Sequence, residues 1–229
     1  IEMVQFHQSY SYEDFIRGYK PNNQENFTLK DGIFYSFCEK AINDQDNNYY
    51  MIIDEINRGN LSKIFGELMM LIESDKRGKK YAVKLAYSEG EETFYIPKNL
   101  YLIGTMNTAD RSLAMVDYAL RRRFSFVNID PAFHTQQFND YLSSKGISQG
   151  FIGRIVTVIN EINQEIINDT VNLGKGYEIG DSYFCPTIER VEDEQKWFDR
   201  IIRLEIAPLL REYWFDQEDK VDELLDRLT

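Results

Sequence analysis

The sequence predicts an α/β fold in which a three-layer, mainly parallel sheet is followed by an all-α region. Short apolar runs alternate with segments of helical spacing as far as residue 130, and helical spacing alone continues beyond it. Strands that alternate with helices pair in parallel, because each connection has to cross back over the sheet. We therefore expect two regions, residues 1–130 and 131–229, that meet at Asp130-Pro131.

The first region contains four apolar runs that we expect to be strands of the sheet: residues 3–6, 49–53, 100–104 and 124–128. Segments with the spacing of amphipathic helices lie between them, at residues 33–42, 61–74 and 113–120. Asn60 is the expected N-cap of the second helix, and Asn57 competes for that position. Residues 81–85 and 93–96 flank a glycine-containing turn and alternate as the strands of a β-hairpin do.

The second region predicts helices at residues 151–168 and 197–214, where large apolar side chains recur every three or four positions. Pro208 lies inside the second of these segments. Because proline lacks an amide donor and crowds the preceding turn, we expect it to kink or divide that helix. Residues 216–228 predict a short, acidic final helix.

Composition limits the classes of function. With 229 residues, 43% of them hydrophobic, the chain is long enough for one large domain or two smaller ones. A net charge of -12 opposes general attraction to a nucleic-acid backbone. Cys38 and Cys185 form no disulfide framework or metal-ligand spacing, and no apolar run is long enough to cross a membrane. We therefore expect a cytoplasmic protein with no membrane partner.

Two adjacent carboxylates, Asp54 and Glu55, end the second predicted strand. Neighbouring side chains on a strand point to opposite faces, and parallel sheets bind ligands at the carboxyl ends of their strands. The pair is therefore typical of a Walker B element, in which the Asp would hold Mg²⁺ through water and the Glu would polarise the attacking water. The alternative is that the two charges only mark where a core strand meets solvent.

Polar residues also follow the third predicted strand. Asn107 could orient water or a terminal phosphate oxygen there without adding charge, which is the role of a sensor residue. The alternative is a turn, in which Asp110 caps the helix predicted after it. The run from Asn107 to Asp110 is also similar to the guanine-reading Asn-Lys-x-Asp motif, a short match that by itself leaves base preference open.

Three arginines, Arg121, Arg122 and Arg123, end the helix predicted at residues 113–120. The helix dipole favours cations at this end, which accounts for one of them. A planar, permanently charged guanidinium also suits a nucleotide phosphate, and one supplied by a neighbouring subunit acts as an arginine finger. This second role requires an oligomer.

Several runs together resemble the AAA+ region of the McrB family, the GTP-hydrolysing subunits of McrBC 5-methylcytosine-dependent restriction systems. The runs are Asp54-Glu-Ile-Asn-Arg58, Leu61-Ser-Lys-Ile-Phe-Gly-Glu67, Met106-Asn-Thr-Ala-Asp-Arg-Ser-Leu113 and Val116-Asp-Tyr-Ala-Leu-Arg-Arg-Arg-Phe124. Similar runs at residues 6–15 and 173–184 extend the resemblance to essentially the whole chain. It implies an AAA+ α/β core at residues 1–130, without its first strand and P-loop, and a helical lid at residues 131–229.

The resemblance also implies roles for individual residues. Asp54 and Glu55 are the Walker B pair, Asn107 is the first sensor, and Asp110 belongs to the signature loop. Arg122 and Arg123 are the expected trans-acting arginines. The implied cofactors are Mg²⁺ and GTP, with ATP as the alternative nucleotide.

The family assembles as a hexameric ring with nucleotide between subunits. By resemblance, a McrC-like endonuclease subunit stimulates hydrolysis, and translocation is coupled to DNA cleavage. DNA is expected to bind an N-terminal domain upstream of this sequence and the channel of the ring.

The chain differs from the family pattern at two places, and these differences limit which functional roles the resemblance implies. The phosphate-binding Gly-x-x-x-x-Gly-Lys-[Ser/Thr] is absent from the chain, and in the family it lies just upstream of the strand that opens this sequence. We therefore expect the segment by itself to bind nucleotide poorly. Asp181 stands where the family usually has His, so no nucleotide-facing role is carried over to it.

Other residues have competing interpretations. His7 and His134 predict packing or surface roles, since neither has a partner at ligand spacing. Tyr10 and Tyr12 predict aromatic packing, with a pore or partner loop as the alternative. The basic run at residues 76–80 is either a DNA contact or a solvated turn.

The sequence is compatible with three functions. The leading one is an NTPase motor subunit, and the second is a non-hydrolysing interaction module of the same fold. The third is a metal-dependent nuclease that uses Asp54 and Glu55. It has the least support, because no further acidic or Lys residue completes a cleavage motif.

Overall fold

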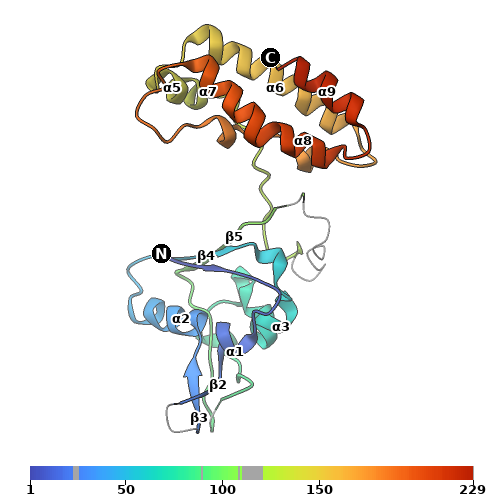
Figure 1. Cartoon of the computed structure of the whole chain (residues 1–229). Coiled ribbons are helices and arrows are strands. Elements are labelled where there is room, and N and C mark those ends of the chain that lie inside the picture. The colour runs from blue at the N-terminus through green and yellow to red at the C-terminus, as the bar shows by residue number, and fades with distance from the viewer. Residues whose placement is uncertain (23–25, 89, 108, 110–120, 229) are drawn as a thin grey trace. The chain divides into compact units, whose positions relative to one another are not determined.

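The computed structural model describes residues 1–22, 26–88, 90–107, 109 and 121–228. Its contacts divide the chain into a sheet unit, Ile1–Phe126, and a helical unit, Val127–Thr229. The sequence analysis expects this boundary after residue 130. Figure 1 shows strands in the sheet unit and a group of packed helices in the helical unit.

A parallel sheet forms the centre of the sheet unit, which confirms the predicted fold class. Its strands are β1 (Glu2–Gln5), β4 (Tyr49–Asp54) and β5 (Leu100–Gly104), in the order β1-β4-β5. Met51 and Ile53 of β4 are fully buried on the face that packs against the helices. Figure 1 shows α2 and α3 on the same side of these strands.

The helix α2 (Ile33–Asn43) confirms the helix predicted at residues 33–42. Five of its residues are buried, and four of these are Phe34, Phe37, Cys38 and Ala41. They follow the i, i+3, i+4, i+7 pattern, which places all four on one face of the helix.

An antiparallel hairpin of β2 (Arg17–Pro21) and β3 (Phe27–Asp31) follows the short helix α1 (Tyr12–Phe15). This hairpin is not predicted from the sequence, because β2 lacks the alternation of apolar and polar residues that marks a half-buried strand. Arg17 anchors it instead. Its guanidinium pairs with Asp31 at 2.6 Å and with Glu92 at 2.8 Å, and it lies 4.1 Å from the centre of the Tyr35 ring.

The single helix predicted at residues 61–74 is divided in the structure. The helix α3 (Leu61–Phe65) begins at the predicted N-cap, where the Asn60 side chain accepts a hydrogen bond from Lys63 N at 3.1 Å. It ends at Gly66, whose φ of 52° is a left-handed conformation that favours glycine. A 3₁₀ segment, η2 (Gly66–Ile72), continues the chain.

Two further predictions need correction. The predicted hairpin is reduced to one antiparallel bridge between Val83 and Phe94. The strand predicted at residues 124–128 is wrong, because those residues form no strand and residues 125–128 are exposed. An apolar run becomes a strand only when a neighbouring strand pairs with its backbone. The helix predicted at residues 113–120 lies outside the described residues.

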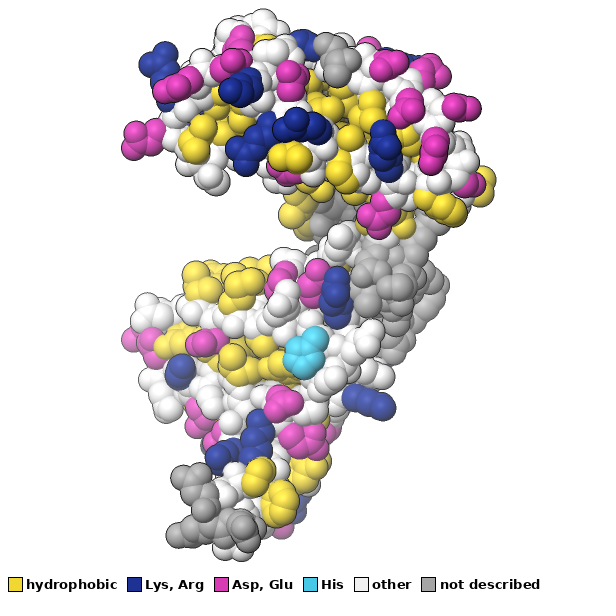
Figure 2. All heavy atoms as spheres, viewed as in Figure 1, with side chains coloured by type: hydrophobic (Ala, Val, Ile, Leu, Met, Phe, Trp, Pro, Cys, Tyr) yellow, Lys and Arg dark blue, Asp and Glu magenta, His cyan; other side chains and the backbone are white. Residues whose placement is uncertain are grey.

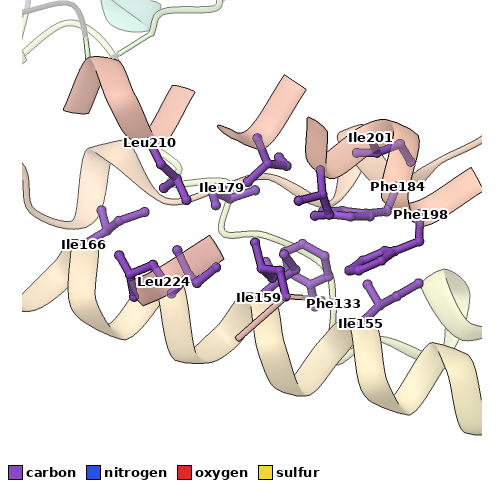
Figure 3. Packing of buried hydrophobic residues seen from close by; sticks show 14 of the residues in the cluster. Phe133, Ile155, Ile159, Ile166, Ile179, Phe184, Phe198, Ile201, Leu210 and Leu224 are labelled. Carbon is purple, nitrogen blue, oxygen red and sulfur yellow. The ribbon is translucent and has the colours of Figure 1, made fainter. Parts of the chain in front are cut away.

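One apolar core holds the helical unit together. Its α-helices among the described residues are α5 (Gln136–Ser144), α6 (Gln149–Asn168), α7 (Glu194–Ile201), α8 (Ala207–Tyr213) and α9 (Glu218–Asp226). Figure 3 shows Ile155, Ile159 and Ile166 of α6 pointing toward side chains of the other helices and loops. The predictions for α6 and α9 are confirmed, whereas α5 is missed.

Pro208 lies where the predicted long helix is divided. The chain passes from α7 through a π-helical turn, η7 (Ile202–Ile206), before α8 begins at Ala207. A wider turn accommodates the missing amide and the bulk of the proline ring.

Among the described residues, no helix combines the length and the apolar character that crossing a bilayer requires. Figure 2 shows Lys and Arg side chains lying among Asp and Glu side chains on the visible face of each unit.

Candidate functional site

The carboxylate of Asp54 is held by side chains from both neighbouring strands. Its Oδ2 accepts a hydrogen bond from Gln5 Nε2 at 3.0 Å, and its Oδ1 accepts one from Thr105 Oγ1 at 2.6 Å. Gln5 is the last residue of β1 and pairs in register with Asp54. Thr105 follows β5. The sequence analysis misses both residues, although each is a polar side chain at the carboxyl end of a predicted strand.

Backbone hydrogen bonds join the segments that leave the three strands. Phe6 N donates to Asp54 O, Thr105 N donates to Ile53 O, and Ile56 N donates to Thr105 O, each at 2.9 Å. These bonds continue the strand pairing past the ends of the sheet. The side chains around Asp54 are therefore carried by backbone that is hydrogen-bonded on both sides.

Glu55 has a left-handed backbone conformation, with φ 51° and ψ 45°. Among the described residues it is the one non-glycine residue with positive φ. This conformation costs an L-amino acid about 1–2 kcal/mol, because the side chain crowds the following carbonyl. Strain of this kind occurs preferentially at functional sites. It places the side chain after Asp54 on a tight turn instead of on the continuing strand.

The carboxylate of Glu55 is largely buried, with 22% of its side chain exposed. Its Oε2 lies 3.2 Å from Arg58 Nε, which is an ion-pair distance. The alignment of the N–H group does not meet hydrogen-bond geometry, and among the described residues Oε2 has no hydrogen-bond partner. The attraction is therefore electrostatic, and the carboxylate keeps its capacity to accept a hydrogen bond.

Asn107 lies in the loop after β5, at the same edge of the sheet as Asp54 and Glu55. Its Oδ1 accepts a hydrogen bond from Ala109 N at 3.0 Å, and its backbone oxygen accepts one from Asn57 Nδ2 at 3.5 Å. The hydrogen bond to the residue two positions on is typical of an Asx turn, while the helix that this turn is expected to start lies outside the described residues. The sensor role of Asn107 stays a prediction. Asp110 lies outside the described residues.

The structure distinguishes the three predicted arginines. Arg123 Nε lies 3.0 Å from Glu73 Oε1, and only 10% of the Arg123 side chain is exposed. Arg121 and Arg122 are exposed. Arg123 is therefore engaged inside the sheet unit, while Arg122 is accessible to solvent.

The residues around Asp54 fit a bound Mg²⁺. Among the described residues, no group of three or more His, Cys, Asp or Glu side chains is arranged to hold a metal ion. Mg²⁺ does not need such a group, because it binds through one or two carboxylates and keeps its other positions for water and substrate phosphates. Asp54 supplies one carboxylate, and its two oxygens retain acceptor capacity after accepting one hydrogen bond each.

Both histidines lie in packing or surface contacts. The His7 ring lies edge-on to Tyr10, with 5.3 Å between ring centres, and a ring nitrogen of His134 lies 3.0 Å from Asn160 Nδ2. Tyr10 itself stacks on Phe6 at 4.8 Å between ring centres. The predicted packing roles are confirmed for these residues.

Two further side chains have internal partners. Tyr12 donates its hydroxyl to Glu67 at 2.6 Å, and burial together with this carboxylate raises the pKa of Tyr12. Asp181 accepts a hydrogen bond from Ala132 N at 2.8 Å. Asp181 thus joins two segments of the helical unit.

The basic run forms turns in the structure. Lys76 pairs with Asp75 at 2.8 Å, and the ammonium groups of Lys76 and Lys80 lie 5.5 and 5.4 Å from the centre of the Tyr81 ring. The solvated-turn interpretation therefore has direct support. A DNA contact by this run stays a prediction.

The middle strand of the parallel sheet ends in two acidic residues, and an amide side chain follows the next strand. This arrangement is typical of an AAA-type α/β core. The chain belongs to the AAA family: residues 1–124 match the family model of the AAA domain, dynein-related subfamily. Residues 154–222 match the family model of the alpha-helical lid domain of McrB. The fold class and the family predicted from the sequence are therefore confirmed.

Two curated relatives extend this result. The chain is 54% identical over 230 residues to the type IV methyl-directed restriction enzyme EcoKMcrB subunit of Escherichia coli (strain K12). That alignment covers 100% of the chain and 50% of the relative. The chain is 24% identical over 254 residues to the type II restriction enzyme BsuMI component YdiS of Bacillus subtilis (strain 168), covering 96% of the chain and 71% of that relative. The chain thus spans half the length of its E. coli relative.

Proposed function

We propose that the protein containing this chain is the nucleoside-triphosphatase motor subunit of a modification-dependent restriction system, with GTP as the preferred nucleotide. The observation that carries the proposal is the placement of Asp54, Glu55 and Asn107 at one edge of the parallel sheet. The 54% identity to a subunit of a methyl-directed restriction enzyme supports the biological role. The GTP preference rests on the resemblance to the McrB family.

Asp54 would hold Mg²⁺ through water at the end of β4. The ion supplies charge neutralisation for the nucleotide phosphates when it is bound. The two hydrogen bonds from Gln5 and Thr105 restrict the rotation of the Asp54 carboxylate. The carboxylate is therefore already oriented before the ion binds. A preorganised group of this kind lowers the free-energy cost of reorganisation during binding and reaction.

Glu55 would polarise the attacking water and accept its proton. A general base has to lie within hydrogen-bond reach of the proton it accepts, and the free acceptor capacity of Glu55 Oε2 meets that need. Arg58 Nε lies 3.2 Å from the same oxygen. The Asn107 side chain would then orient the same water from the neighbouring loop.

Arg122 is the better candidate for the trans-acting arginine, since it is exposed and Arg123 is paired with Glu73. An arginine supplied by a neighbouring subunit stabilises charge on the transferred phosphoryl group and contributes about 10³ to 10⁵ in rate. Stimulated turnover therefore requires assembly, for which we propose the hexameric ring of the family.

A McrC-like endonuclease subunit is the proposed partner that stimulates hydrolysis. The chain contains no phosphate-binding Gly-x-x-x-x-Gly-Lys-[Ser/Thr] sequence, so the main phosphate contacts would come from a segment upstream of it. A DNA-recognising domain in that upstream part would supply the site specificity. Hydrolysis in the ring would then drive DNA translocation before cleavage by the partner.

The test uses the full-length protein and its partner nuclease. Turnover of GTP and of ATP is measured for the parent, for Glu55→Gln and for the matched control Glu91→Gln, whose side chain is exposed. We expect Glu55→Gln to lose at least about 100-fold in turnover, as removal of a general base does, while Glu91→Gln keeps the parental rate. Parental turnover in Glu55→Gln would refute the assignment.

The alternative is a non-hydrolysing interaction module of the same fold. The observation that favours it is that Glu55 and Arg123 are both engaged by internal partners, Arg58 and Glu73. Sedimentation and nucleotide turnover of the full-length protein distinguish the motor subunit from the interaction module. Ring assembly without nucleotide, together with no turnover of either nucleotide, would support the interaction module.

A further inference from the structure

We propose that Gln5 and Thr105 are positioning residues that fix the Asp54 carboxylate for its role toward Mg²⁺ and nucleotide. The proposal rests on the proposed function of Asp54. Each oxygen of this carboxylate accepts one hydrogen bond, at 3.0 Å from Gln5 Nε2 and at 2.6 Å from Thr105 Oγ1. Neither donor carries a charge.

The two donors come from the strands on either side of β4, so their positions depend on the sheet register. Gln5 is opposite Asp54 in the β1-β4 pair, and Gly104 is opposite Ile53 in the β4-β5 pair. Thr105 is therefore the next residue after the paired strand. Its own N–H donates to Ile53 O at 2.9 Å, which holds the Thr105 backbone beside Asp54.

The chemistry of the donors suits a carboxylate that has to bind a cation. An ionised carboxylate has about four acceptor positions, and two hydrogen bonds leave the others available. A Lys or Arg at either donor position would compensate the negative charge that attracts the ion. A hydroxyl and an amide orient the carboxylate while leaving its net charge unchanged.

A purely structural role for these hydrogen bonds makes a different prediction. If Gln5 and Thr105 only fasten the strands together, their removal changes the melting temperature and leaves the affinity for the ion unaffected. If they position Asp54, their removal weakens metal binding, because residues that orient a metal ligand typically contribute about 10- to 100-fold in metal affinity or activity. Metal affinity is therefore the readout that separates the two roles.

The experiment uses the full-length protein with a non-hydrolysable GTP analogue and Mn²⁺ as the spectroscopic probe. The affinity for Mn²⁺ is measured by electron paramagnetic resonance for Thr105→Val, Thr105→Ser and Gln5→Met. Thr28→Val is the matched control, since Thr28 is an exposed residue of β3. We expect Thr105→Val and Gln5→Met to bind Mn²⁺ about 10- to 100-fold more weakly. Thr105→Ser, which keeps the hydroxyl, and the control should bind at the parental affinity.

Parental Mn²⁺ affinity in Thr105→Val and Gln5→Met would overturn the inference, as would equal losses in Thr105→Ser and Thr105→Val. If Thr105→Val does not fold, the comparison of Gln5→Met with the parent decides the question. Asp54→Asn separates this inference from the proposed function. A parental affinity in Asp54→Asn removes the role of Asp54 itself, whereas a loss there beside parental values in the other variants removes only the positioning role.

Discussion

The guanidinium of Arg123 lies against the carboxylate of Glu73, with 3.0 Å between Arg123 Nε and Glu73 Oε1. Glu73 follows η2, and 31% of its side chain is exposed, compared with 10% for Arg123. This ion pair joins the end of the 3₁₀ segment to the arginine run. The pair also distinguishes Arg123 from its sequence neighbour Arg122, which is exposed.

Replacing Arg122 and Arg123 singly by Ala should therefore have different effects. We expect Arg122→Ala to lower partner-stimulated turnover by about 10³-fold or more, with the stability unchanged, because an exposed arginine contributes little to folding. Arg123→Ala should lower the free energy of unfolding by about 1–2 kcal/mol, because it leaves Glu73 partly buried without this cation. Turnover and denaturant unfolding of both variants check this, with Arg121→Ala as the control. A parental turnover in Arg122→Ala would contradict the assignment.

The strained backbone at Glu55 predicts that a glycine at this position stabilises the fold more than an alanine does. Glycine adopts a φ of 51° without crowding, so Glu55→Gly should be about 1 kcal/mol more stable than Glu55→Ala, which keeps the strain. Both variants should lose turnover, because neither carries the carboxylate. Urea unfolding compares the two stabilities. Equal unfolding free energies would show that the turn relaxes when the side chain is removed.

Replacing Arg77 should have a large effect on stability, because its guanidinium donates hydrogen bonds to backbone carbonyls. Its guanidinium donates to Ile72 O at 3.1 and 2.8 Å and to Leu100 O at 2.6 Å, and burial lowers its pKa. Arg77→Met should lower the free energy of unfolding by about 2–3 kcal/mol, because two carbonyls lose their donors.

Arg77→Lys should recover only part of this loss, since one ammonium cannot reproduce the planar fork. The matched control is Lys79→Met, which removes an exposed cation from the next turn and should leave the unfolding midpoint in urea unchanged. A midpoint in Arg77→Met equal to that of the control would show that water replaces the guanidinium at both carbonyls.

Asp169 predicts an acid-sensitive contact in the helical unit. It accepts hydrogen bonds from Trp214 Nε1 at 2.8 Å and from Asn172 N at 3.1 Å, and the indole hydrogen bond is the main cause that lowers the pKa of Asp169. A pKa lowered by folding means that the ionised form stabilises the fold. This contribution is complete above the unfolded value of 3.8 and is lost as the pH falls through the lower folded value.

Thermal melts at pH 5 and pH 3 check this prediction. The parent should lose more melting temperature between the two pH values than Asp169→Asn, because the variant has no carboxylate to protonate at this position. Asp140→Asn, at an exposed carboxylate on α5, serves as the control and should follow the parent. An identical loss in the parent and in Asp169→Asn would show that other groups determine the acid response.

The elements that could be predicted are those whose burial is visible in local spacing. The helices α2 and α6 have apolar residues at helical intervals, and β4 and β5 are short apolar runs, so each was located from its own residues. The hairpin has no such pattern in its first strand, β2. It is held by the contacts of Arg17 with Glu92 and Tyr35, which are distant in the chain and could not be anticipated.

The candidate site also contains residues that the sequence predicts and residues that only the folded structure identifies. Asp54 and Glu55 were found because two carboxylates at the end of an apolar strand are an unusual pattern. Gln5 and Thr105 were missed, because a Gln and a Thr at the ends of other strands become informative only when the strand order places them beside Asp54.

From its amino acids alone, the chain specifies the strands β4 and β5, the helices α2 and α6, and the acidic end of β4, because hydrophobic periodicity is a local property. The strand order and register, the end of α3 at Gly66, and the engagement of Arg123 by Glu73 arise only after folding. Each of these depends on which distant residues become neighbours, and that is set by the packing of the whole sheet unit.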